Sequence, residues 1–595
     1  MSEKSFFRSW GAEYVAVGTV RFRLWAPGQA SITLRLDGND RAMKPAGEGW
    51  FELQVEEVKP GAEYSFVLSD GSAVPDPASR AQKATVNGPS LVVDPTGYRW
   101  QHDDWQGIPW ERAVVYELHI GTFTPAGTFS AAIEKLPYLA ELGITLIEVM
   151  PVAQFGGDRG WGYDGVLFYA PHAAYGTPDE FKAFIDAAHG YGLSVVLDIV
   201  LNHFGPEGNW LPQLAPDFFD PQRNTPWGNG IAYENDAVRR YIVEAPLYWL
   251  TEYHLDGLRF DAIDQIKDRA DQHVLEEIAG RIRSEITDRP IHLTTEDSRN
   301  VTFLHPRAED GSAPLFTGEW NDDVHNAAHV LATGETQGYY RDFAQQPEKW
   351  LARALVEGFA YQGEVSVHSG EPRGEDSTAQ PPAAFVDFIQ NHDQTGNRAQ
   401  GERLVSLAGA DRTRILLATL LLSPHIPLLF MGEEYGETHP FLFFTDFHGD
   451  LARAVREGRA KEFDGHAGHG GESVPDPNAA ETFQRSKLDW EKRHGEEGKA
   501  WLALVRQLLL LRQQHIVPLI AGAAVATGEV LMTAPGGMAV RWQFAAGTLS
   551  LAFNLSENAL SLPALPGKTL FAWPAETAQL GHNTMIVRLA EGNAQ

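Results

Sequence analysis

Short alternating runs of hydrophobic and polar residues fill the first hundred positions of the chain. Residues 20–25 and 64–68 are examples, and Gly, Pro, Asn and Asp separate such runs. Alternation with a period of two predicts strands that bury one face and expose the other. We therefore predict an N-terminal antiparallel β-sandwich over residues 1–105, of a kind found in carbohydrate-binding domains.

After residue 105 the pattern changes to apolar, β-branched runs that alternate with segments of helical period. The eight runs that we predict to be strands are residues 113–120, 144–150, 194–200, 255–261, 291–296, 316–320, 384–390 and 426–431. The helical segments between them include residues 130–142, 178–189, 235–253 and 412–422. Eight such repeats, with no Gly-rich phosphate loop before any helix, favour a (β/α)8 TIM barrel over a doubly wound sheet.

Two stretches interrupt the predicted barrel, which we place at residues 106–515. Residues 202–232 are rich in Pro, Gly, Asn and Trp, and residues 436–490 are rich in Gly, Pro, His and Asp. Loops of this length in a compact chain are commonly functional. A predicted helix at 498–514 then leads into a second region of alternating runs, which predicts an antiparallel C-terminal β domain over 516–595.

Composition narrows the classes of partner and of chemistry. The 595 residues include 79 Asp and Glu against 48 Lys and Arg, a formal charge of −31, and no Cys. The electrostatic field of a protein with this negative charge repels phosphate backbones and anionic lipid, so we expect neither nucleic acid nor a membrane as partner. Without Cys, catalysis has to use carboxylates, His, Lys, Ser or Tyr. The charged N-terminus lacks the apolar core of a signal peptide, which predicts a cytoplasmic protein.

Polar side chains occupy the ends of four predicted strands. They are Asp198 and His203 on the third strand, Arg259 and Asp261 on the fourth, Glu296 on the fifth, and His392 and Asp393 on the seventh. The carboxyl ends of barrel strands meet at one face, where the active sites of such barrels lie. We therefore expect these side chains to converge on one site.

The fourth strand places Arg259 and Asp261 on the same face, because side chains alternate with a period of two. A guanidinium beside Asp261 keeps that carboxylate ionised, as a nucleophile requires. Glu296, next to several like charges in a partly enclosed site, belongs to a set in which at least one carboxyl pKa is raised. A protonated acid beside an ionised one is the working pair of glycoside hydrolysis.

Each of these residues also has a purely structural interpretation. Arg259 and Asp261 alone could form an ion pair inside the barrel, while Glu296 or Asp393 alone could cap a helix. The two histidines, His203 and His392, could be packed in the core or hold a metal, but we favour hydrogen bonds to sugar hydroxyls. The coincidence of acids at four strand ends favours catalysis over the structural interpretations.

Taken in order and spacing, residues 198–203, 257–261, 296 and 391–393 resemble the four short conserved regions of the α-amylase superfamily, glycoside hydrolase family 13. The resemblance implies a retaining mechanism with Asp261 as nucleophile, Glu296 as acid/base and Asp393 as stabiliser of the transition state. It further implies that the reacting sugar is surrounded by Arg259, His203, His392 and Asp198, and that it rests on Tyr163. In the first insertion, Trp210 and Trp227 are candidates either for stacking on glucose rings or for packing within their own loop.

The N-terminal β domain resembles that of the branching and debranching enzymes and of the maltooligosyltrehalose trehalohydrolases within that family. The runs at 316–323, 361–364, 391–398 and 429–436 look most like the trehalohydrolases. The resemblance implies cleavage of the α-1,4 bond beside the terminal trehalose unit of maltooligosyl trehalose. It also implies action in series with a maltooligosyl trehalose synthase. Our candidates for gripping the trehalose end are Glu319, Trp320, Asn321, Asp322 and Glu364.

Two other functions stay open at this point. A glycogen-branching enzyme would have the same front domain and the same carboxylates, but would pass the glycosyl group to a sugar instead of water. A non-catalytic glucan-binding barrel would be marked by the loss of a catalytic carboxylate, and none is missing here. Asn202 matches a calcium ligand of many amylases, yet residues 202–232 hold few further acids, so we predict no required metal and no cofactor.

Overall fold

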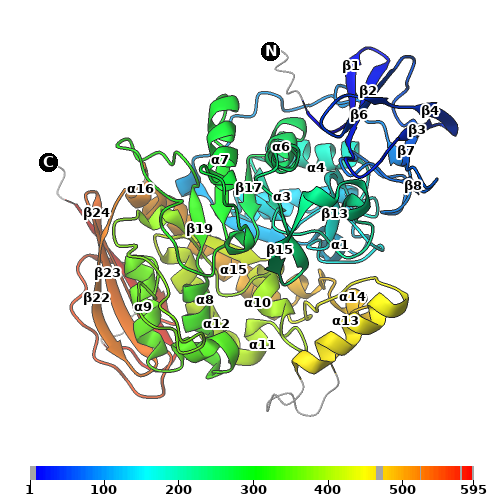
Figure 1. Ribbon diagram of the computed structural model, residues 1–595. Coiled ribbons are helices and arrows are strands. Elements are labelled where there is room, and N and C mark those ends of the chain that lie inside the picture. The colour runs from blue at the N-terminus through cyan, green and yellow to red at the C-terminus, as the bar shows by residue number, and fades with distance from the viewer. Residues whose placement is uncertain (1–7, 464–473, 523, 576–578, 593–595) are drawn as a thin grey trace.

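The computed structural model describes residues 8–463, 474–522, 524–575 and 579–592. Its centre is a closed barrel of eight parallel strands, as the apolar runs predict (Figure 1). The strands are β10 (Val115–Leu118), β11 (Leu146–Val149), β14 (Ser194–Ile199), β17 (Gly257–Phe260), β18 (His292–Thr295), β19 (Gly318–Trp320), β20 (Phe385–Asp387) and β21 (Ile426–Phe430). All eight predicted strands are present, and the prediction of a TIM barrel is confirmed.

Helices surround the barrel strands. They include α4 (Pro178–Gly190), α6 (Asp236–Glu252), α7 (Val274–Glu285), α8 (Asp322–Thr333), α9 (Pro347–Glu357), α11 (Leu404–Ala408), α12 (Ala410–Leu422) and α15 (Glu496–Leu511). The helix predicted at 130–142 is divided into α2 (Phe129–Ile133) and α3 (Leu136–Leu142). Pro137 stands in the first turn of α3, where its missing N–H does no harm, and it stops α2 from continuing.

The N-terminal region forms two antiparallel sheets, ordered β1-β2-β6-β5 and β4-β3-β7-β8, with β9 beside β7. Their strands are β1 (Gly11–Ala16), β2 (Thr19–Trp25), β3 (Thr33–Leu36), β4 (Asn39–Ala42), β5 (Lys44–Pro45), β6 (Trp50–Val55), β7 (Glu63–Val67), β8 (Ala73–Val74) and β9 (Ser90–Leu91). This is the predicted sandwich. Figure 1 shows it at one end of the molecule, next to α6.

Trp10 fastens the sandwich to the barrel. Its ring is fully buried and packs edge-on against Tyr241 of α6, with the ring centroids 5.2 Å apart. The indole Nε1 donates to the Ala237 carbonyl at 3.0 Å. Beside it, the Ser9 backbone N–H donates to the Glu244 carboxylate at 2.7 Å. Ser9 and Trp10 thus belong to a core that the sandwich shares with the barrel.

Both predicted insertions form structure of their own after barrel strands. The first contains the short helix α5 (Leu211–Leu214) and a hairpin of β15 (Phe219–Thr225) and β16 (Gly228–Ile231). The second contains α13 (Gly449–Glu462) and α14 (Ala480–Arg485), which lie together at the edge of the molecule (Figure 1). Part of the second insertion, residues 464–473, lies outside the described residues. A smaller excursion after β11 pairs β12 (Ala153–Phe155) with β13 (Gly165–Pro171).

The C-terminal region is one antiparallel sheet in the order β22-β23-β24-β26-β25. Its strands are β22 (Thr527–Ala534), β23 (Gly537–Phe544), β24 (Gly547–Asn554), β25 (Lys568–Trp573) and β26 (Thr584–Glu591). Trp542 joins this sheet to the barrel, because its buried indole donates to the Leu355 carbonyl of α9 at 2.9 Å. The sheet lies at the far end of the molecule from the N-terminal sandwich (Figure 1).

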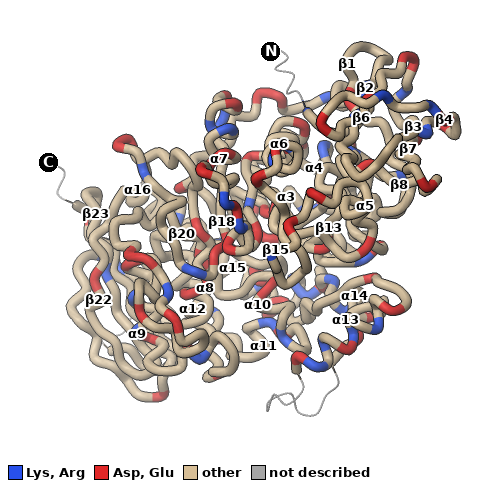
Figure 2. The backbone as a smooth tube through the Cα atoms, viewed as in Figure 1, with Lys and Arg blue, Asp and Glu red and all other residues tan. Residues whose placement is uncertain are grey.

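In Figure 2, acidic and basic positions are interspersed along the tube. Among the described residues no helix is long and apolar enough to cross a membrane.

We expect Trp10→Ala to lower the free energy of unfolding by about 3–5 kcal/mol, as for other buried Trp truncations. The substitution removes the ring packing against Tyr241 and the hydrogen bond to α6 together. Calorimetric unfolding of the purified variant measures the effect, with Val17→Ala, at a fully exposed position, as the control. An unfolding profile equal to that of the wild type would show that the sandwich is not held through Trp10.

Candidate active site

One guanidinium joins the carboxylates that end three neighbouring strands. Arg259 lies in β17 with its side chain 1% exposed, inside the barrel. Its Nη1 is 2.8 Å from Asp198 Oδ2 and 3.0 Å from Asp261 Oδ1, and its Nη2 is 2.8 Å from Glu296 Oε2. The guanidinium carbon also lies over the Trp320 ring, 4.2 Å from the ring centre. The predicted convergence of strand-end residues is therefore present.

The backbone after β17 fixes the two central carboxylates relative to each other. Ala262 takes a left-handed conformation, with φ of 40°, and its N–H donates to Glu296 Oε2 at 3.0 Å. The Asn202 amide donates to the Asp261 side chain at 3.1 Å and to the Asp261 carbonyl at 2.9 Å. Asn202 therefore orients Asp261. Within the described part of the chain, no group of three or more His, Asp and Glu side chains is arranged to hold a metal ion.

The two site histidines have opposite electrostatic surroundings. Burial lowers the pKa of His203 to about 4, so that the ring is neutral, and its Nε2 lies 2.9 Å from the Tyr163 carbonyl. Burial also acts to lower the pKa of His392, but the Glu117 carboxylate outweighs it, and the pKa is raised above its ordinary value. Glu117 contacts the ring at Nδ1 and accepts from the backbone N–H of His392 at 3.0 Å. The His392 ring is stacked on Tyr163, with the ring centroids 5.1 Å apart.

Three further acids of the site bind protons more tightly than free carboxylic acids. Burial raises the pKa of Asp198 to about 7 against the opposing charge of Arg259. Burial also raises the pKa of Asp393, and the nearby Glu296 carboxylate adds to this effect. For Asp322, burial and the charges of Glu296 and Asp393 raise the pKa to about 7. Crowding of acids thus raises carboxyl pKa values in this site, as the sequence predicts.

Several of the site residues line a cavity of about 370 Å³, a size typical of small-molecule sites. Its wall includes Tyr163, His203, Trp227, Arg259, Asp261, Glu296, His392, Asp393, Asn397 and Phe443. A second cavity of about 740 Å³, under the β15–β16 hairpin, shares Asp164, His203, Trp227 and Phe443 with the first and so adjoins it. Trp227 is 47% exposed and lies flat on the His203 ring, with centroids 4.0 Å apart. Trp210 instead donates to Asn87 of the N-terminal region at 3.1 Å.

Comparison with family models identifies the barrel. Residues 65–227 and 228–508 match the model described as alpha amylase, catalytic domain, and residues 526–590 match a domain of unknown function. The chain belongs to the α-amylase family.

Similar proteins place the chain more narrowly within this family. The malto-oligosyltrehalose trehalohydrolase of Deinococcus radiodurans is 45% identical over 84% of this chain and 81% of its own length. That of Mycobacterium tuberculosis is 39% identical over 96% of this chain and 99% of its own. The chain therefore belongs to the malto-oligosyltrehalose trehalohydrolases, which are glycoside hydrolases of the α-amylase family.

Two further comparisons show a near structural relative and a more distant sequence relative. The crystal structure of a putative alpha amylase from Salmonella typhimurium has a TM-score of 0.97 and 74% identity, covering 98% of this chain and 100% of that one. A 1,4-alpha-glucan branching enzyme from Photobacterium profundum is 32% identical over only 42% of this chain and 38% of its own length. The similarity to the branching enzyme is thus partial.

One of the five residues predicted to grip the trehalose end lies near Glu296 and Asp393. Asp322, at the start of α8, lies within the electrostatic reach of Glu296 and Asp393, and its Oδ1 accepts from Gln394 Nε2 at 3.3 Å. Trp320 lies beneath Arg259. A direct role in sugar binding is therefore supported best for Asp322.

The other three candidates bond to protein groups. Glu319 is buried and accepts from the Asp297 backbone N–H at 2.7 Å, and Asn321 is buried and donates to the Gly358 carbonyl at 2.8 Å. Glu364 accepts from the Gln362 N–H at 2.7 Å and pairs with Arg353. None of the five candidates is among the residues that line the 370 Å³ cavity, and the polar atoms of these three support the loops around the site.

The sequence analysis missed two acids inside the barrel. Glu117 of β10 and Glu148 of β11 are register partners, and both are buried. Burial, with Glu117 and Asp198 nearby, raises the pKa of Glu148 well above its usual range. A single acid within each apolar strand run was the available signal, since such an acid needs a partner on the inner face of the barrel.

We expect Glu117→Gln to lower turnover about 10- to 100-fold, the size expected for losing a hydrogen bond to a charged group. Removing the carboxylate lowers the pKa of His392, so the alkaline limb of the pH–rate profile moves to lower pH. Glu148→Gln is the matched control, since it makes the same change at the register partner of Glu117 on β11. A Glu117→Gln profile superimposable on that of the wild type would rule out this role.

Proposed function

We propose that this enzyme hydrolyses the α-1,4 bond next to the terminal trehalose unit of maltooligosyl trehalose, releasing trehalose and a shorter maltooligosaccharide. The central observation is the pair of carboxylates, Asp261 and Glu296, held on the two Nη atoms of one buried guanidinium in a sugar-sized cavity. The names of the relatives that match almost the whole chain support the choice of substrate.

In this proposal the reaction retains the configuration of the anomeric carbon, because two successive displacements take place at that carbon. Arg259 pairs with the Asp261 carboxylate and the Asn202 amide donates to it, so that Asp261 is aimed at the anomeric carbon and attacks it while Glu296 protonates the departing glycosidic oxygen. Water activated by Glu296 then breaks the glycosyl–Asp261 bond. Asp393 holds hydroxyls of the distorted ring, which strengthens binding in the transition state.

The order of strands around the barrel supports an orientation for the substrate. The larger cavity lies under the insertion that follows β14, whereas Asp322 follows β19; β17 and β18, which carry Asp261 and Glu296 at their ends, stand between them. We place the maltooligosyl chain in the larger cavity, with Trp227 on its wall, and the trehalose on the Asp322 side. The reacting glucose then rests on Tyr163, with Asp198, His203 and His392 around its hydroxyls.

The proposed substrate also implies where the enzyme acts. A terminal trehalose on a glucan has to be made first, so we propose an enzyme of the maltooligosyl trehalose synthase class upstream, acting in the cytoplasm. Trehalose and a shortened glucan are the products of the pair.

Incubation with maltotriosyl trehalose and, separately, with maltopentaose tests the substrate. We expect free trehalose and maltotriose from the first and little change in the second, because only the first places a trehalose beside Asp322. Chromatography of the released sugars is the measurement. Comparable hydrolysis of both would indicate a general amylase, and longer or branched products from maltopentaose would indicate a transferase.

We expect Asp261→Ala and Glu296→Gln each to lower kcat by about 10³-fold or more, since each removes one partner of a two-carboxylate mechanism. Initial rates on maltotriosyl trehalose measure the loss. Asp94→Asn, outside the site, serves as the control, and calorimetry checks that all variants are folded. Near-normal activity in either catalytic variant would refute the role given to that residue.

A further inference from the structure

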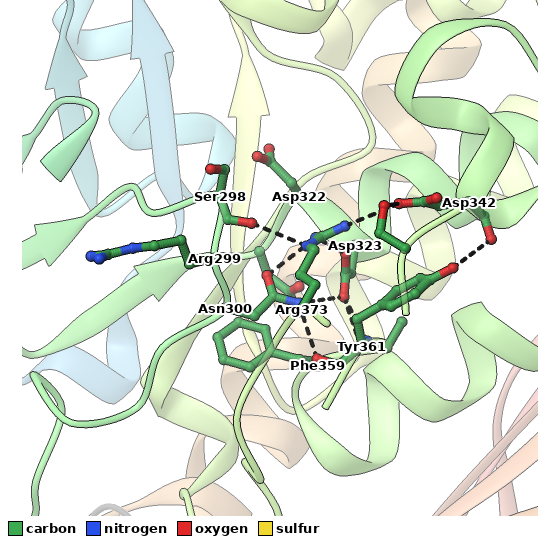
Figure 3. A network of polar contacts seen from close by, with 12 residues as sticks. Ser298, Arg299, Asn300, Asp322, Asp323, Asp342, Phe359, Tyr361 and Arg373 are labelled. Atoms are coloured by element: carbon green, nitrogen blue, oxygen red, sulfur yellow. Dashed lines mark hydrogen bonds and ion pairs between the residues drawn. The ribbon is translucent and has the colours of Figure 1, made fainter. Parts of the chain in front are cut away.

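A segment between α9 and β20, residues 359–375, crosses the loop that follows the acid/base strand. Arg373 makes the connection (Figure 3). Its Nε donates to the Ser298 carbonyl at 3.0 Å, and its Nη2 donates to Asn300 Oδ1 at 3.2 Å. The same Nη2 forms an ion pair with Asp323. One side chain therefore links the loop after Glu296 to the first turn of α8.

The crossing segment holds Arg373 in one place. The Gly363 N–H donates to the Arg373 carbonyl at 2.7 Å, and the Arg373 N–H donates to the Glu364 carbonyl at 2.9 Å. Gly374 follows with a φ of 92°, and a Cβ there would meet the Tyr361 carbonyl oxygen at 1.9 Å. The backbone on both sides of the guanidinium is thus closely packed, so that little freedom remains at its base.

Asp323, the partner of Arg373, is completely buried. Its Oδ2 accepts from the Asn300 amide at 2.8 Å and from the backbone N–H groups of Ala360 and Tyr361 at 2.8 and 3.0 Å. The carboxylate thereby ties three segments together: the start of α8, the loop after β18 and the crossing segment. Breaking such a buried pair by removing one member leaves the other charge without compensation.

Asp322 precedes Asp323 and points away from Arg373 in Figure 3, while the network holds the backbone between them. The charged groups around Asp322 are Glu296 from the end of β18, Asp393 from α10 (His392–Gly396), the neighbouring Asp323, and Arg373. Burial and the three acids raise the pKa of Asp322, and Arg373 acts in the opposite direction. Arg373 therefore affects both the position and the charge of Asp322.

We propose that Arg373 is a positioning residue, which fixes the start of α8 against the acid/base loop and so directs the Asp322 carboxylate to the trehalose that leaves from the Glu296 side. This inference rests on the proposed function. It adds that selectivity for the trehalose end depends on a side chain that does not itself contact the sugar.

Inhibition by added trehalose during hydrolysis of maltotriosyl trehalose is the readout, because it reports binding on the leaving-group side. We expect Arg373→Gln to weaken this inhibition about 10- to 100-fold, the size of a lost hydrogen bond to a charged group. Arg373→Lys keeps the positive charge but not the planar guanidinium, so it should retain part of the inhibition that Arg373→Gln loses. Arg353→Gln, which removes another guanidinium bonded to the same segment through the Ala360 carbonyl, is the matched control and should leave inhibition unchanged.

The pH dependence of inhibition distinguishes an effect of Arg373 on Asp322 from an effect on stability alone. If the Asp322 carboxylate binds trehalose, inhibition is lost as the pH falls through its pKa. Without the charge of Arg373 that pKa rises, so in Arg373→Gln the loss should begin at higher pH than in the wild type. A shift in the melting temperature alone, with inhibition and its pH profile equal to those of Arg353→Gln, would overturn the proposal.

A double variant identifies Asp322 as the residue through which Arg373 acts. Asp322→Asn should weaken trehalose inhibition, and adding Arg373→Gln should weaken it little further, because residues that act through each other are not additive. Full additivity would overturn the proposal. Failure of the wild-type enzyme to release trehalose would refute the proposed function instead, so the two failures are distinguishable.

Discussion

The ion pairs of the buried Arg259 guanidinium are the interactions on which the rest of the site depends. An isolated charge inside a barrel is strongly destabilising, and it persists only where opposite charges and hydrogen bonds compensate for it. Here Asp198, Asp261 and Glu296 supply that compensation from three adjacent strands. The dependence is mutual, since the three carboxylates would repel one another without the cation between them.

A second buried contact between an acid and a basic side chain lies elsewhere in the barrel, between Glu117 and His392. Glu117, from the first barrel strand, contacts His392, which follows the seventh, and raises the pKa of its ring. His203, which has no carboxylate partner of this kind, is neutral. The short barrel strands therefore fix a pattern of charges as well as positions, and a substrate meets electrostatic groups that need no rearrangement during the reaction.

The elements with a strong local pattern could be predicted from the sequence, and those set by tertiary contacts could not. Apolar, β-branched runs marked all eight strands, and acids at strand ends marked the group that gathers around Arg259. Glu117 and Glu148 lie inside such runs, where the pattern does not reveal which side faces the axis. Arg373 and Asp323 are 50 residues apart, and only the path of the crossing segment brings them together. Glu319 and Asn321, beside Asp322 in sequence, instead point into the loops that support the site.

Under the proposed function, the residues of the chemical step and the residues that select the leaving sugar lie in different parts of the fold. Arg259, Asp261 and Glu296 belong to strand ends, where the closed barrel leaves little freedom. Asp322 owes its place to a helix start that is held by Arg373, a residue of a long segment outside the barrel. Segments of that kind tolerate change more readily than strands do. Under the proposed function, the leaving-group side is therefore built from the segments that the barrel constrains least.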